Sequence, residues 1–120
     1  MKNNIYSLLL MLISQSAVGG EVTVVDARAT SGDTGVYRFD VTLRHADSGW
    51  DHYADSWELV APSGAILGKR VLYHPHVNEQ PFTRSLSGVA IPEGIDQIGI
   101  RAHDKLHGDS AQLFRVDLPR

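Results

Sequence analysis

The sequence predicts an all-β fold, a seven-stranded antiparallel sandwich of the immunoglobulin or fibronectin type III kind. Three observations predict it. Apolar and polar residues alternate along short segments after position 20, turn residues separate these segments, and a tryptophan falls in the third segment. No window shows a sustained helical period. An eight-stranded jelly roll is the alternative fold.

The first twenty residues are typical of a secretory signal peptide. Lys2 supplies a basic start, an apolar run covers 5–13, and small side chains follow, ending at Gly19 and Gly20. The run is too short for a membrane span, which requires about 20 residues. We therefore expect residues 1–20 to be cleaved, residues 21–120 to form one domain, and the mature protein to be periplasmic or secreted, with no membrane span.

The first three strands are predicted at 22–28, 36–45 and 56–61. Along the second strand, polar residues alternate with an apolar row formed by Tyr37, Phe39, Val41 and Leu43. One face of this strand therefore meets a core and the other meets water. The cluster TSGDTG at 30–35 is a turn, whereas 46–55 is a long polar and aromatic loop. Trp57 is expected in the core because its neighbours alternate around it.

The remaining strands are predicted at 65–73, 82–89, 95–102 and 111–118. Short turns rich in Pro and Gly occupy 62–64 and 91–94. Two longer connections carry the sequences HPHVNEQP and HDKLHGDS, the second at 103–110. If consecutive strands run antiparallel, the three short turns lie at one end of the sandwich and the three long loops at the other. All six histidines belong to the long loops or to their edges.

This convergence predicts a metal or proton-sensitive site. Residues two apart in an extended chain face the same side, so His74 and His76 can point together. His103 and His107 can flank one ion if their loop forms a turn, and the further candidate ligands are His45 and His52. Carboxylates that could join as ligands or orient an imidazole are Glu79, Asp104, Asp51 and Asp47. Such a set suits Zn²⁺, Cu²⁺ or a non-haem iron.

Aromatic residues near the same loops form a second candidate region, a rim for a ligand or a protein partner. Trp50 and Tyr53 stand among acidic residues in WDHYADSW. They could equally cap the open end of the core. Arg84 and Arg70 bracket the histidine loop, and pairing with Glu79 and Asp55 is expected more than anion binding.

Composition excludes several classes of function. The chain has no cysteine, and both methionines precede position 20. Thiolate, blue-copper and thioether Cu(I) sites are therefore excluded in the mature domain. The net charge of the chain is −3 and there is no basic run. This balance argues against binding to nucleic acid or to an anionic membrane surface.

The stretch WDHYADSWELVAPSGAILGKRVLYHPHVNEQPFTRSLSG, together with IRAHDKLHG, resembles a family of small secreted bacterial proteins of unknown function. The resemblance covers nearly the whole mature chain. It implies an exported single-domain protein and brings no activity, cofactor or catalytic residue.

Three hypotheses remain at this stage. The first is a metal-binding module, and the second is a metal-free module that recognises a protein or small ligand through the same loops. An enzyme that uses histidine and carboxylate is the least favoured. A chain this short has little surface for a closed cleft, and it lacks a nucleophile motif such as G-x-S-x-G.

Overall fold

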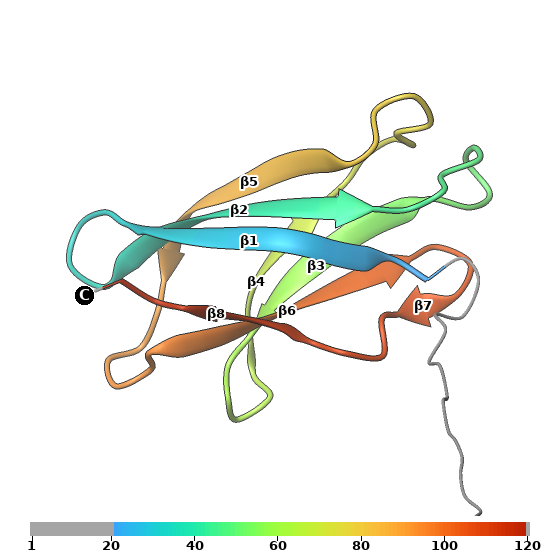
Figure 1. Ribbon diagram of the computed structural model, residues 1–120. Helices are drawn as coiled ribbons and strands as arrows, with labels where there is room; N and C mark the ends of the chain where they lie inside the picture. Colours follow the sequence, from blue (N-terminus) through green and yellow to red (C-terminus); the bar gives the residue numbers. More distant parts are fainter. Residues whose placement is uncertain (1–20, 120) are drawn as a thin grey trace, which may run out of the picture.

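The computed structural model describes residues 21–119, which form two antiparallel β-sheets in two layers (Figure 1). The predicted all-β sandwich is confirmed. One sheet has the order β1-β2-β5, and the other has the order β4-β3-β6-β7, with β8 also pairing with β6. The strands are β1 (Thr23–Ser31), β2 (Val36–Arg44), β3 (Ala54–Val60), β4 (Ile66–Val71), β5 (Phe82–Ala90), β6 (Gln97–Asp104), β7 (Gly108–Asp109) and β8 (Phe114–Asp117). The predicted signal peptide, residues 1–20, lies outside the described range.

The structure has eight strands where the sequence predicts seven. Strand β6 continues to Asp104, and the chain then turns back into the two-residue β7, inside the expected loop 103–110. Gly108 permits this tight return because its φ of 83° lies in the left-handed region that favours glycine. The loop boundary at His103 is therefore wrong, since His103 and Asp104 belong to a strand and face opposite sides of the sheet.

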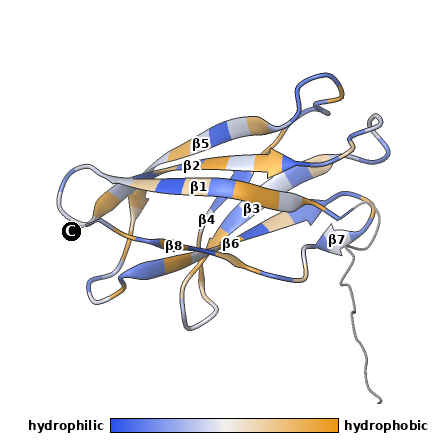
Figure 2. Ribbon diagram, in the orientation of Figure 1, coloured by the Kyte–Doolittle hydropathy of each residue, from blue (hydrophilic) through white to orange (hydrophobic). Residues whose placement is uncertain are grey.

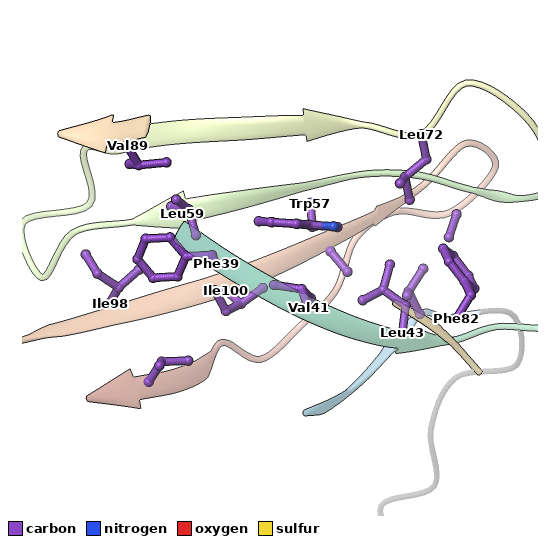
Figure 3. Packing of buried hydrophobic residues seen from close by; sticks show 14 of the residues in the cluster. Phe39, Val41, Leu43, Trp57, Leu59, Leu72, Phe82, Val89, Ile98 and Ile100 are labelled. Atoms are coloured by element: carbon purple, nitrogen blue, oxygen red, sulfur yellow. The ribbon is translucent and has the colours of Figure 1, made fainter. Parts of the chain in front are cut away.

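The core lies between the two sheets and is built by the alternating strands (Figure 2, Figure 3). The inward row of β2 consists of Phe39, Val41 and Leu43, all fully buried as expected. Across from it, β3 contributes Trp57, which is also fully buried. Alternation therefore predicts the inner face of the sandwich correctly, including the tryptophan.

Strand order gathers the β2–β3, β4–β5 and β6–β7 connections at one end of the sandwich (Figure 1). Direct contacts join these connections. The backbone N–H of His76 donates to Asp47 Oδ2 at 2.7 Å, and Lys105 Nζ donates to the Trp50 carbonyl at 2.9 Å. This end of the domain therefore holds the histidine-rich segments in mutual contact.

Candidate metal site

Asp104 is the centre of the histidine cluster. It ends β6, faces inward and is fully buried. Its Oδ2 accepts hydrogen bonds from His45 Nε2 at 2.7 Å and His52 Nε2 at 2.8 Å. Its Oδ1 accepts the N–H groups of Leu106 at 2.7 Å and His107 at 3.2 Å. One carboxylate thus fixes two imidazoles and shapes the turn to β7.

The same contacts keep Asp104 ionised. Burial acts to raise its pKa because it removes water from the charged form. The hydrogen bonds from Leu106 N–H, His52, His107 N–H and His45 together outweigh burial, so the pKa of Asp104 lies below its ordinary value. An anionic oxygen of Asp104 therefore lies beside the Nε2 atoms of both imidazoles.

His45 stands between two carboxylates, with its side chain completely buried. Its Nδ1 lies 2.5 Å from Asp47 Oδ1, while its Nε2 bonds Asp104. Asp47 is itself held by the backbone N–H groups of Ala54 at 3.0 Å and His76 at 2.7 Å. Both carboxylates accept from the ring, so an ion at Nε2 would displace the proton donated to Asp104 while the Nδ1–H stays on Asp47. Asp47 therefore orients His45 as the outer carboxylate does in carboxylate–histidine–metal arrangements.

Two ring-to-ring distances in the cluster match those of imidazoles that share an ion. The ring centroids are 4.8 Å apart for His45 and His52, and 5.0 Å apart for His52 and His107. Two imidazoles that share an ion at about 2.0–2.1 Å, with an angle between 90° and the tetrahedral value, have centroids roughly 4.5–5.2 Å apart. The spacing therefore permits His107 to approach an ion held by the other two.

Ligand atoms of His45, His52 and Asp104 all lie within 4.8 Å of one another, so this buried group could hold a metal ion. Its oxygen-to-nitrogen separations of 2.7 and 2.8 Å are hydrogen-bond lengths. Ligand atoms around a tetrahedral ion are roughly 3.3 Å apart. An ion entering here must replace the protons of these bonds and move the side chains apart by roughly half an ångström.

His76 and His74 form a separate pair on the β4–β5 connection. The His76 ring is buried and stacks on Phe82, with a centroid distance of 4.0 Å and an interplanar angle of 11°. Neither ring nitrogen of His76 has a hydrogen-bond partner in the described part of the chain. Burial, followed by the positive charges of Arg84 and His74, lowers the pKa of His76.

His103 lies apart from the other five histidines because it faces the outer side of β6. A bulge between Ala54 and Ser56 turns Asp55 toward the same side. Its Oδ1 lies 2.5 Å from His103 Nδ1. This pair lines a cavity of about 170 Å³ together with Ser56, Glu58, Lys69, Val71 and Asp109. The structure does not bring His103 and His107 around one point.

The remaining predicted residues lie in or beside the connections around the histidine cluster. Arg84 Nη2 donates to Glu79 Oε1 at 2.9 Å, which is the expected pairing, and Arg84 thereby holds the pKa of Glu79 below its ordinary value. Asp51 is exposed in the β2–β3 connection. Trp50 is 60% exposed, whereas Tyr53 is buried beneath it, with ring centroids 5.8 Å apart.

Two features of this region escaped the sequence reasoning. Gln80 bridges the connections, because its Oε1 accepts the His45 N–H and its Nε2 donates to the His76 carbonyl. Asp55 pairs with His103 rather than with an arginine. The turn-capping role of Asp104 could be predicted from the sequence. An aspartate often accepts the N–H groups two and three residues after it, which here belong to Leu106 and His107.

Replacing His76 with Phe is expected to stabilise the domain by about 1–2 kcal/mol, because it removes two unpartnered buried nitrogens and keeps the ring stacked on Phe82. A histidine with a lowered pKa binds fewer protons in the folded chain than in the unfolded chain. The neutral His76 ring therefore leaves the stability of the domain constant above the ordinary pKa of 6.5, and the domain loses stability as pH falls below that value. Urea unfolding of His76→Phe should therefore show less acid sensitivity than the parent. A loss of stability on substitution would contradict this account.

The chain was compared with protein families, curated proteins and solved structures. No family model matches the chain, and no solved structure matches it. The chain is similar to a protein of Halomicrobium mukohataei named "Putative lipoprotein", with 41% identity over 97 residues, or 81% of this chain. The chain spans about half of that relative, 47% of its length. No helix in residues 21–119 is long and apolar enough to cross a membrane.

Proposed function

We propose that this chain is an exported domain that binds one divalent transition metal ion through His45, His52 and Asp104. The observation that carries the proposal is the buried convergence of two imidazole nitrogens and one ionised carboxylate oxygen within 4.8 Å. Nitrogen and oxygen donors, with no sulfur after position 20, suit Zn²⁺ or Cu²⁺. The site would store or present the ion rather than build a closed catalytic cleft.

His107 is proposed as a fourth ligand. Its backbone N–H already bonds Asp104, and its ring centroid lies 5.0 Å from that of His52. A small rotation of its side chain would add a third imidazole, giving the four-coordinate arrangement that Zn²⁺ adopts in closed sites. Because the His52 side chain is 20% exposed, the ion would enter between His52 and His107.

Export is proposed on two grounds. Residues 1–20 carry the pattern of a secretory signal peptide. The similar protein of Halomicrobium mukohataei is named "Putative lipoprotein", and 81% of this chain takes part in that match. Residues 21–120 would then constitute the exported domain.

Calorimetric titration of the full chain with Zn²⁺ or Cu²⁺ tests the metal site. We expect binding tighter than about 10 μM, or roughly −7 kcal/mol. His52→Gln should weaken binding by at least the 10–100-fold that loss of an outer partner costs in metal sites (about 1.4–2.7 kcal/mol). His103→Gln is the matched control, because His103 lies on the opposite face of β6 and should leave the affinity unchanged. Equal losses in both variants, or no binding tighter than about 10 μM, would reject the proposal.

A second candidate function is recognition of a protein or small ligand by the same loops without metal. The observation that favours it is Trp50, which is 60% exposed at the tip of the β2–β3 connection. Lys105 fixes this tip by donating to the Trp50 carbonyl and lies 5.7 Å from the Tyr53 ring centroid. A partner that is lost on Trp50→Ala but retained in the presence of a chelator would favour this function.

A further inference from the structure

We propose a second cation site formed by His74 and His76, separate from the cluster around Asp104, which takes a single Cu²⁺ ion. The site lies on the β4–β5 connection, where Pro75 separates the two histidines. It stands on its own observations and does not require the Asp104 cluster to bind metal.

The first observation is the burial of the His76 ring. The residue is 5% exposed, and both of its ring nitrogens are enclosed without a hydrogen-bond partner in residues 21–119. A buried polar atom in this state destabilises the fold. Phe would fill the same position against Phe82 without that cost. The buried imidazole nitrogens therefore favour a ligand at this position.

The second observation is how the two rings are held. His74 Nδ1 lies 3.2 Å from the Pro75 carbonyl oxygen, an acceptor that takes an Nδ1–H and leaves the Nε2 lone pair available. His76 Nδ1 lies 3.9 Å from Asp47 Oδ2, which favours a proton on that nitrogen too. The local geometry thus leaves Nε2 as the ligand atom of each ring.

The spacing of the rings agrees with a shared ion. Their centroids are 4.7 Å apart, with an interplanar angle of 40°. This value falls in the range of roughly 4.5–5.2 Å expected for two imidazoles on adjacent positions of one ion. The separation also matches that of His45 and His52 in the Asp104 cluster, which is 4.8 Å.

The surrounding carboxylates define which ion fits. Glu79 is paired with Arg84, and Asp47 is occupied by His45 and by backbone N–H groups. The site therefore offers two imidazoles, and the carboxylates beside it already have other partners. Hard cations such as Mg²⁺ and Ca²⁺ require oxygen ligands, whereas imidazole suits copper, which also stands highest in the order of divalent affinities.

Asp47 separates the two sites and serves both. Its Oδ1 faces His45 of the Asp104 cluster, and its Oδ2 accepts the His76 N–H at 2.7 Å and faces the His76 ring. One buried carboxylate thus orients an imidazole of each site, on opposite sides of itself. Two ions bound in this way would occupy neighbouring but distinct positions.

The test is the number of Cu²⁺ ions retained by the full chain after titration with CuSO₄ and removal of loosely bound ion. The parent should retain two ions per chain, and His76→Phe should retain one. This variant is suitable because it is expected to be more stable than the parent. His52→Gln, which removes a ligand of the other cluster, should also retain one ion. The electron paramagnetic resonance spectrum of copper-loaded His52→Gln should show two coordinated nitrogens, from His74 and His76.

The outcomes separate this inference from the proposed function. Equal retention by the parent and His76→Phe would overturn the second site, whatever the Asp104 cluster binds. If only the Asp104 cluster failed, the parent and His52→Gln would each retain one ion and His76→Phe would retain none. His103→Gln serves as the control for copper held by an exposed histidine, and it should match the parent.

Discussion

Replacing Asp104 with Asn is expected to lower the free energy of unfolding by about 3–5 kcal/mol and to abolish metal binding at the histidine cluster. Asn keeps the size of the side chain and can still accept the N–H groups of Leu106 and His107. It removes the charge that faces two imidazoles, and His45 is then left completely buried with only Asp47 as an acidic partner. Urea unfolding near pH 7 would measure the change.

The matched control is Asp55→Asn. The Asp55–His103 pair has the same short separation as the Asp47–His45 pair, 2.5 Å, but its side chains are 26% and 37% exposed. Solvent screening limits exposed pairs of this kind to about 0–1 kcal/mol. Similar losses of stability in Asp104→Asn and Asp55→Asn would show that burial does not set the strength of the cluster.

Replacing Trp57 with Ala is the second large effect, and we expect a loss of about 3–5 kcal/mol. The side chain is fully buried between the two sheets, and its removal leaves a cavity that the strands on either side cannot fill (Figure 3). Thermal unfolding should show a drop of more than about 10 °C, since about 1 kcal/mol moves the midpoint by about 4–8 °C in a domain of this size.

Trp57→Phe provides the comparison for this prediction. The indole Nε1 is buried without a hydrogen-bond partner in the described part of the chain. Phe removes that unpaired donor while it preserves most of the packing, so the two effects oppose each other and the net change should stay below about 1.5 kcal/mol. A Phe variant as unstable as the Ala variant would contradict this account.

Alternation predicted most of the fold because one face of each central strand must avoid water. The row of Phe39, Val41 and Leu43 and the burial of Trp57 follow directly from this requirement. Strand order then placed the long connections at one end without any knowledge of the side-chain contacts. His45 is in phase with Leu43, and its side chain is completely buried.

The sequence could not show which histidines meet. His103 and His107 seemed to share a loop, but the last residues of β6 pair with β7, and Gly108 closes the return. Adjacent strand residues face opposite sides, so Asp104 points into the cluster while His103 points away from it. A bulge at Asp55 adds a local change of direction that alternation does not predict.

The sequence also could not predict which groups the buried polar side chains contact. Asp47 contacts His45, Ala54 and His76, which are brought together only by tertiary packing of two connections. The tendency of aspartate to accept backbone N–H groups in turns accounts for the bonds of Asp104 Oδ1 to the N–H groups of Leu106 and His107. The two imidazoles on its other oxygen come from residues 59 and 52 positions away in the chain.

The most direct test is a crystal structure of the full chain grown with Zn²⁺, with anomalous diffraction recorded at the zinc edge. The proposed function predicts a strong anomalous peak about 2.0–2.2 Å from the nearest atoms of His45, His52 and Asp104, with the hydrogen bonds between them opened. A structure in which His45 Nε2 and Asp104 Oδ2 remain 2.7 Å apart at saturating zinc, with no peak between them, would contradict it.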